Sequence, residues 1–367
     1  MIKKIRSQKK RQWKCQQNKK QGISKAKYPA ALRSFAMTLH FYSPKAYEFV
    51  RQKFCKALPD PNTLRSWYSS IDGTPGFTFE SFEALKKKVV ASKKSNKKVL
   101  VTFMLDEISI KKSLQRLPNG KICGYVDFGS EMESNDTIPL TKDALVMMVV
   151  SLDESWKIPL GYFLINGIDS ATNSGLIREA LIRLHEIEVE VVSLTLDGPS
   201  EHFATMRALG ASFDLLNLKP FFPHPSTQEK IHIIFYACHM LKLVRNTLGD
   251  LKILKDAEGN SIEWRFIEAL AQLQKKEGLR AGNKLKMAHI HYWKMKMKVA
   301  LAAQTLSDSV ADSIEFCDKY LNLVEFKGSE ATVKFIRCIN RIFDFLNSRN
   351  FFAKGFKAPL TKFNEEF

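Results

Sequence analysis

Residues 191–200 read VVSLTLDGPS, and this stretch decides how the chain is interpreted. An apolar, β-branched run ends at Asp197, and Gly198 and Pro199 follow it directly. The run predicts a buried strand, whereas Asp-Gly and Gly-Pro are ordinary turn dipeptides. Asp197 is therefore either a residue that begins a turn or a carboxylate held at a strand end to bind a metal ion. Choosing between the two interpretations requires partner residues elsewhere in the chain.

A second carboxylate occupies the equivalent place on another predicted strand. Asp106 follows the apolar run 99–105 in FMLDEIS, and it lies 91 positions (197 − 106) before Asp197 in LTLDGPS. If these two runs are neighbours in one sheet, both carboxylates emerge side by side. Paired carboxylates either share a proton or are neutralised by a cation, and their oxygens suit Mg²⁺ or Mn²⁺ in phosphoryl transfer. Spacing alone is weak evidence, because many α/β proteins end strands in Asp.

The order of apolar runs and amphipathic stretches predicts a mixed α/β sheet followed by helices. A short helix at 200–210 has Gly210 as its C-cap, and a strand that begins at 231 runs into a further helix. From about residue 251 onward we expect helices only. The expected strands are 99–105, 122–128, 144–152, 156–166 and 189–197, and the amphipathic helix between the last two is 173–189.

The first 27 residues form a basic arm. They contain eleven Lys or Arg and no acid, within a chain of 367 residues whose formal net charge is +19. Such an arm is typical of a segment that binds a polyanion, and nucleic acid is the expected partner through phosphate contacts. The alternatives are a nuclear-import signal or a solubilising tail.

Three short helices are expected after the arm. The first carries apolar residues from 32 to 42, and Ser43 and Pro44 supply the N-cap and the first position of the second. We expect the second helix to direct Phe54 inward, and the third to begin at residue 61 or 62. Short helices with tight turns beside a basic arm predict a helix-turn-helix module that binds DNA. The alternative is a small helical subdomain that packs on its neighbour.

Cysteine usage and hydropathy exclude several classes of protein. The six Cys are scattered without a C-x-x-C pair, which argues against a disulfide framework and a zinc ribbon. No apolar run approaches 18 residues, and the basic N-terminus lacks the apolar segment of a secretory signal. We therefore expect an intracellular, reduced protein that does not span a membrane.

Longer motifs resemble one known family. The stretches LDEISI, GYVDFG, KDALVMMVVSLDESWKIPLGYFLING, VEVVSLTLDGPS, FPHPS and ACHMLKLVRN occur in this order. They resemble the P-element transposase family, including its relatives that carry a zinc-binding THAP domain, whose Cys and His pattern is not found in this sequence. The resemblance implies a helix-turn-helix region at 28–91 and the first part of an RNase H-like catalytic domain at 98–249. Residues 250–367 resemble an incomplete helical GTP-binding insertion domain.

The resemblance also implies the site residues. Asp106 and Asp197 match two of the family's three catalytic, metal-binding acids. The third, a Glu, is expected beyond residue 367, because Glu365 and Glu366 stand in the wrong context. We therefore expect the chain to be catalytically incomplete by itself. Tyr236 replaces an acid of related sequences, and that acid either supports the metal or only caps the next helix.

Residues after Tyr236 are open to two interpretations. His239 is expected to be a polar-core residue beside the site rather than a ligand. Lys242, Arg245 and Asn246 either contact DNA phosphates or form the solvated face of a helix.

Two functions remain open on the sequence. One is a nuclear DNA transposase that cleaves and transfers strands of transposon-end duplex DNA. The resemblance then implies Mg²⁺ or Mn²⁺ and GTP as cofactors, although the family's purine-reading acid is expected beyond residue 367. The other is a domesticated or remnant DNA-binding protein that forms homo-oligomers with longer copies and regulates without catalysis.

Overall fold

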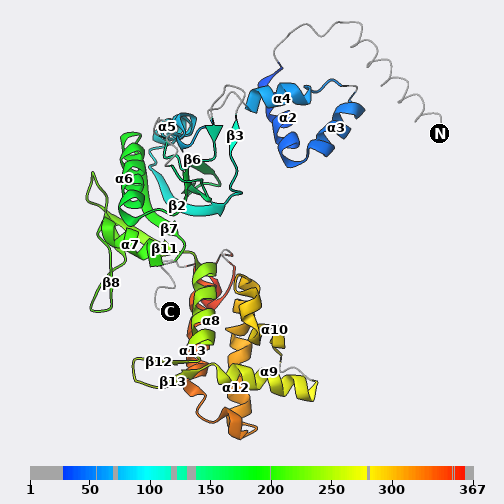
Figure 1. Ribbon diagram of the computed structural model, residues 1–367, viewed down its shortest axis with the longest axis vertical. Helices are drawn as coiled ribbons and strands as arrows, with labels where there is room; N and C mark the ends of the chain where they lie inside the picture. Colours follow the sequence, from blue (N-terminus) through cyan, green and yellow to red (C-terminus); the bar gives the residue numbers. More distant parts are fainter. Residues whose placement is uncertain are drawn as a thin grey trace, which may run out of the picture. The chain divides into compact units, whose positions relative to one another are not determined.

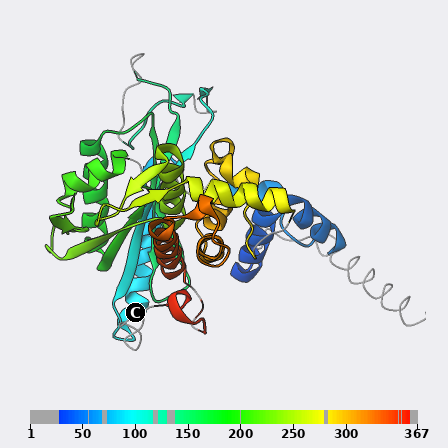
Figure 2. The same cartoon turned by 90° about the horizontal axis from the view of Figure 1, so that it is seen from below.

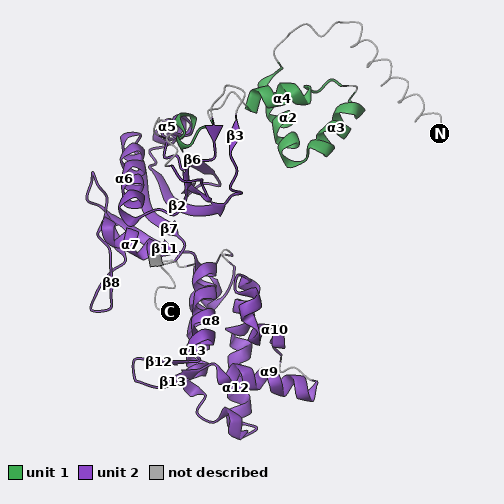
Figure 3. Ribbon diagram, in the orientation of Figure 1, with its two compact units in different colours: residues 1–80 green, residues 81–367 purple. Residues whose placement is uncertain are grey.

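The computed structural model divides the chain into two compact units, residues 1–80 and 81–367 (Figure 3). Among the described residues, none of the helices combines the length and apolarity needed to cross a membrane. The predicted basic arm, residues 1–27, lies outside the described part. The structure describes residues 28–54, 56–68, 73–116, 122–129, 138–198, 200–278, 282–348, 350 and 352–359.

The first unit is built from three helices (Figure 1). The predicted cap at the start of the second helix is confirmed, since the Ser43 hydroxyl accepts a hydrogen bond from the Ala46 N–H at 3.1 Å. Ala36, Tyr47, Leu58 and Leu64 form its buried core. The elements of this unit are α2 (Ala30–Tyr42), α3 (Pro44–Lys53), α4 (Pro61–Tyr68) and the two-residue β1 (Gly76–Phe77).

The expectation that Phe54 points inward is wrong, because this side chain is 64% exposed. Phe54 is the C-cap of α3 rather than part of the helix, so its side chain leaves the face that Tyr47 and Val50 share. Helical spacing therefore identified the face but extended it one residue too far.

A mixed sheet organises the second unit. The strands β6, β5, β2, β7, β11 and β10 lie side by side in this order. β5 pairs antiparallel with β2 and β6, β7 pairs parallel with β2 and β11, and β10 is antiparallel to β11. The strands are β2 (Val99–Ser109), β5 (Asp143–Ser151), β6 (Lys157–Ile165), β7 (Val189–Leu196), β10 (Phe221–Pro223) and β11 (Lys230–Phe235).

One predicted strand is not a strand of this sheet. In the region 122–128, only Ile122 and Cys123 form a strand, β4, which pairs with β3 (Gln115–Arg116). Gly124 has φ +120°, and a Cβ there would lie 2.3 Å from the Ser113 carbonyl oxygen. The backbone turns at this glycine, so the residues after it make isolated bridges instead of a regular ladder.

Helices pack beside the sheet (Figures 1 and 2). α6 contacts both α7 and β7, as the alternating pattern of strands and helices predicts. Asp169 caps α6 by accepting hydrogen bonds from the Ala171 and Thr172 N–H groups. Gly210 follows α7 with φ +115°, as its predicted C-cap role requires. The helices are α5 (Phe79–Lys93), α6 (Ser170–Glu186) and α7 (Ser200–Leu209), and a hairpin of β8 (Ser212–Asp214) and β9 (Asn217–Lys219) follows.

A helical bundle completes the second unit and includes α8 (Ala237–Leu251). Leu241 and Leu248 of α8 share one buried core with Trp264 and Phe266. The expectation of helices alone is wrong at one place, where β12 (Ile253–Lys255) and β13 (Ser261–Glu263) form a hairpin. The further helices are α9 (Arg265–Glu277), α10 (Met287–Ile290), α11 (Val299–Thr305), α12 (Asp308–Lys319) and α13 (Glu330–Leu346), with 3₁₀ turns η1 (Tyr292–Met295), η2 (Val324–Phe326) and η3 (Gly355–Lys357).

Candidate metal centre

Asp106 and Asp197 stand at the same level of the sheet. The first and fifth of the expected strands, β2 and β7, are parallel neighbours, and Met104 pairs with Thr195. Asp106 and Asp197 each lie two residues after this pair, Asp106 after Met104 and Asp197 after Thr195. The expectation that Asp106 directly follows its strand is wrong. Asp106 lies within β2, because β5 pairs with β2 as far as Ser109.

The two carboxylates interact electrostatically. Partial burial and then the negative charge of Asp197 raise the pKa of Asp106 above its usual range. The Glu107 N–H opposes this by donating to Asp106 Oδ1 at 2.9 Å. Repulsion between neighbouring carboxylates is relieved by a proton or a cation. Hard carboxylate oxygens prefer Mg²⁺ or Mn²⁺, so this pair fits a divalent cation by its donor atoms and charge.

The N-terminal turn of α8 lies next to Asp197. His239 Nδ1 lies 3.3 Å from Asp197 Oδ1, so this side chain is a direct partner of the carboxylate. Gly198 allows the close approach of α8, because a Cβ at this position would lie 2.8 Å from Met240 Sδ. The expected place of His239 beside the site agrees with this contact.

Tyr236 brings a neutral phenol to the carboxylates. Its hydroxyl lies 3.5 Å from the carbonyl oxygen of Leu105. Burial, and then the charges of Asp106 and Asp197, raise the pKa of Tyr236 to about 12. Tyr236 is also the N-cap residue of α8, where its side chain makes no capping hydrogen bond. Position 236 thus lies next to the carboxylates and at the start of α8, but the Tyr236 side chain does not cap the helix.

His202 is a buried neighbour of the site that the sequence interpretation missed. Its Nδ1 lies 2.9 Å from the Asp197 carbonyl oxygen, and its Nε2 lies 3.9 Å from Glu107 Oε1. Burial lowers the pKa of His202, but the contacts with Glu107 and Asp197 outweigh it and raise the pKa. A lone His five residues after Asp197 carried no sequence pattern that predicted this position.

Three further residues considered in the sequence analysis, Arg245, Glu365 and Glu366, are not described as part of this site. Arg245 faces neither solvent nor an open groove, since it is fully buried and donates from Nη2 to the Lys296 carbonyl at 3.0 Å. Glu365 and Glu366 lie outside the described residues. Within the described ranges, no group of three or more His, Cys, Asp or Glu side chains is arranged to hold a metal ion. Asp106 and Asp197 therefore form a pair without a described third acid.

The sheet order and the paired acids define an RNase H-like fold with two carboxylates at its centre, and three family models match the chain in sequence order. Residues 1–67 match the "Transposable element P transposase-like, HTH domain". Residues 73–210 match the "TNP-like, RNase H N-terminal domain", and residues 238–359 match the "TNP-like, GTP-binding insertion domain".

The chain is also similar to known transposases in sequence and in fold. The chain is 31% identical over 335 residues to "DNA transposase THAP9" of Homo sapiens, which covers 91% of this chain and 36% of that relative. Its fold is similar to the "Drosophila P element transposase strand transfer complex", with a TM-score of 0.73 and 24% identity over 92% of this chain and 70% of that one. The chain belongs to the P-element-like transposase family, and it spans about a third of the length of the human relative.

These findings confirm the predicted fold class. The chain combines a helix-turn-helix domain, an RNase H-like mixed sheet and a helical insertion domain of the GTP-binding type. They also confirm the family to which the sequence motifs pointed.

Proposed function

We propose that Asp106 and Asp197 are two of the metal-binding acids of a DNA transposase that cleaves and transfers strands at transposon ends. The observation that carries this proposal is the pair of carboxylates at one level of adjacent parallel strands, where the charge of Asp197 raises the pKa of Asp106. A bound divalent cation supplies activation of water or a hydroxyl group and stabilises the leaving oxygen. His239 and His202 then hold Asp197 in place through its carboxylate and its backbone carbonyl.

Metal binding tests this proposal without depending on turnover. We expect calorimetric titration of the full chain with Mn²⁺ to show a site that Asp106→Asn and Asp197→Asn each weaken at least tenfold. Each change removes one of the two anionic ligands. Asp153→Asn is the matched control, because Asp153 is an exposed acid in the turn between β5 and β6. Equal Mn²⁺ affinity in all four proteins would overturn the assignment of the site.

Catalysis is measured separately, on duplex DNA that carries the transposon ends. If the wild-type chain cleaves DNA, its Mg²⁺-dependent nicking is lost in Asp106→Ala and Asp197→Ala. Nicking that is equal in all three proteins contradicts the catalytic proposal. Metal binding and DNA binding without any nicking favour the second candidate, a DNA-binding regulator that acts without catalysis.

Duplex DNA is the proposed partner, and the nucleus is the proposed location. The helix-turn-helix match at 1–67 and the eleven basic residues of the first 27 support DNA binding. Counterion release makes phosphate-dominated binding fall steeply with salt. We also propose homo-oligomers, which sedimentation analysis measures directly. The division that we propose is an arm at 1–27, helix-turn-helix at 28–91, RNase H-like part at 98–249 and insertion at 250–367.

We further propose that the helical insertion binds GTP. The family-model match at 238–359 supports this, and so does the run of sequence 282–307, which contains five Lys and no acid. Lys296 pairs with Asp250 at 3.2 Å, and a cluster of lysines favours a phosphate ligand. We expect GTP, but not ATP, to raise the unfolding temperature of the chain. An equal effect of both nucleotides, or of neither, contradicts guanine recognition.

A further inference from the structure

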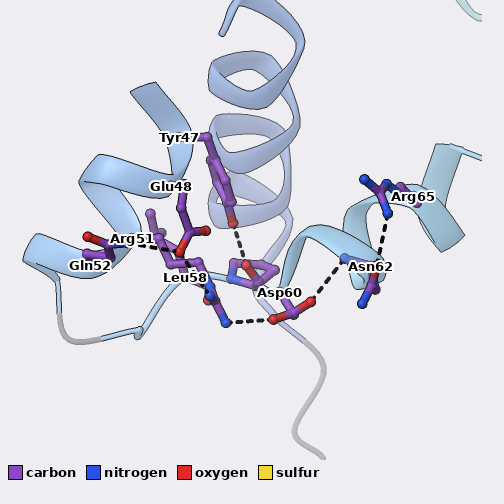
Figure 4. A network of polar contacts seen from close by, with 9 residues as sticks. Tyr47, Glu48, Arg51, Gln52, Leu58, Asp60, Asn62 and Arg65 are labelled. Atoms are coloured by element: carbon purple, nitrogen blue, oxygen red, sulfur yellow. Dashed lines mark hydrogen bonds and ion pairs between the residues drawn. The ribbon is translucent and has the colours of Figure 1, made fainter. Parts of the chain in front are cut away.

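Helix α4 of the first unit is fixed at its start by a network of hydrogen bonds (Figure 4). The buried Tyr47 hydroxyl donates to the Pro59 carbonyl oxygen at 2.7 Å. Arg51 donates from Nε to the Leu58 carbonyl at 3.3 Å and from Nη2 to Asp60 Oδ2 at 2.8 Å. Two side chains of α3 thus hold the turn that leads into α4. Long-range polar contacts of this kind restrict the direction in which α4 leaves the turn.

The network continues onto the exposed face of α4. Asp60 Oδ1 accepts a hydrogen bond from the Asn62 N–H at 3.1 Å, which caps the helix. Asn62 Oδ1 in turn accepts from Arg65 Nη1 at 3.2 Å. At the other end of α4, the Tyr68 hydroxyl donates to the Met37 carbonyl of α2 at 2.7 Å. The helix is therefore held at both ends. Figure 4 shows Arg65 held by Asn62 of the same helix.

Arg65 has no acidic partner among the described residues, so its guanidinium can bind an external acceptor. Residues 28–68 contain six Lys or Arg and two acids. Both acids pair with Arg51, Glu48 at 3.6 Å and Asp60 at 2.8 Å. Across the described part of this chain, no carboxylate forms an ion pair with Arg65, and its side chain is exposed. One of its five N–H groups is used on Asn62, and four remain.

We propose that Arg65 is a specificity-determining residue that reads a guanine in the major groove of duplex DNA, and that Asn62 positions it. In a helix-turn-helix protein, the last helix of the motif enters the major groove and its N-terminal residues contact base edges. A guanidinium donates two hydrogen bonds to O6 and N7 of guanine, which is the commonest specific contact. This inference rests on the proposed DNA binding and names the side chain that gives it sequence preference.

Duplex DNA is favoured over duplex RNA by groove shape. The major groove of B-form DNA admits a helix, whereas that of A-form RNA is too deep and narrow for side chains to read. A planar guanidinium held by Asn62 suits a base edge, because a fixed fork matches two acceptors in one plane. A lysine bound only to phosphate needs no such orientation.

Selection of the full chain against a library of random duplex DNA tests the inference. We expect the wild type to enrich a motif with guanine at one defined position. Arg65→Ala lowers the preference for that guanine by about 5- to 150-fold, as expected for loss of a paired contact to one base. Asn62→Ala lowers it less, and Arg65→Lys does not restore it, because an ammonium cannot present the same fork.

Lys45→Ala is the matched control, since it removes one exposed positive charge from α3 of the same unit. This control weakens all sequences alike and lowers the salt slope by about one, leaving the motif unchanged. Unfolding temperatures equal to the wild type show that the exposed substitutions leave the fold intact.

The outcomes of this selection distinguish a failure of DNA binding from a failure of the role proposed for Arg65. If the wild type fails to bind duplex DNA, the proposed DNA binding fails, and this inference with it. If the wild type binds and enriches no motif, or if Arg65→Ala keeps the same motif, the role of Arg65 is overturned while DNA binding stands. Equal competition by a duplex RNA of the same length also overturns base reading in a DNA groove.

Discussion

Tyr236 affects the net charge around the carboxylates of Asp106 and Asp197. Its pKa is raised to about 12, so its phenol is neutral at physiological pH. Asp106 and Asp197 therefore have a neutral hydroxyl group as a neighbour. A neutral neighbour reduces the charge that the site offers to a cation, so metal affinity rests on the two Asp residues.

His224 gives the protein a residue-scale dependence on pH. Burial, and then the neighbouring His185, lower the pKa of His224 below its ordinary value of 6.5. The folded state therefore binds fewer protons here than the unfolded state. The stability due to neutral His224 is complete above pH 6.5 and declines as the pH falls below it. The contribution of His224 to the denaturant midpoint is therefore expected to fall between pH 7 and pH 5.

His224→Asn isolates this effect. The Nδ1 atom of His224 accepts hydrogen bonds from the Ser226 and Thr227 N–H groups at 3.1 and 3.3 Å, and an Asn Oδ1 accepts in the same region without titrating. We expect the fall in stability between pH 7 and pH 5 to be smaller in this variant. His202 has the opposite sign, because its pKa is raised, so only the difference between the two proteins is informative. An unchanged pH dependence contradicts the assignment to His224.

Helix α8 joins the carboxylate pair to the helical core. At its N-terminus His239 contacts Asp197, and in its second half Arg245 and Leu248 are fully buried. Arg245 lies 5.1 Å from the ring centroid of Tyr292, whose hydroxyl donates to Asp250 at 2.5 Å. Helix α8 thus carries both the contact with Asp197 and the buried contacts of the helical core. The packing of α8 therefore fixes the position of His239.

Two glycines test this packing with opposite signs. Gly249 of α8 meets Tyr292, since a Cβ there would lie 2.4 Å from the ring. We expect Gly249→Ala to destabilise the protein by about 1–3 kcal/mol through overpacking. Gly175 of α6 has no atom within 4 Å of such a Cβ, so Gly175→Ala stabilises by about 0.5–1 kcal/mol through helix propensity. Denaturant unfolding measures both values, and the same sign in both variants contradicts the close contact with Tyr292.

Elements with a clear pattern could be predicted, and tertiary contacts decided the others. The apolar runs of β2, β5 and β7 and the Ser43–Pro44 cap were sufficient signals. The β12–β13 hairpin was missed because its strands are only three residues long. The burial of Arg245 could not be predicted, because a basic helix residue faces solvent unless another segment covers it.

At the scale of the whole molecule, ordered motifs carried the identification. The three family-model matches follow the same order as the motifs in the sequence, from helix-turn-helix to RNase H-like part to insertion. The equivalent places of Asp106 and Asp197 after two apolar runs predicted neighbouring carboxylates if their strands were adjacent, and that strand pairing is confirmed. The support by His202 depends on where α7 returns to the sheet, which no local pattern encodes.

Iron-directed cleavage of the full chain tests the central claim most directly. Fe²⁺ bound in place of Mg²⁺ and treated with ascorbate and peroxide cuts the backbone next to its ligands, and mass spectrometry locates the cuts. The account predicts cuts near residues 106 and 197 together, competed by Mg²⁺ and lost in both Asp106→Asn and Asp197→Asn. Cuts at only one of these strands, or cuts that persist in both variants, would contradict a shared metal site.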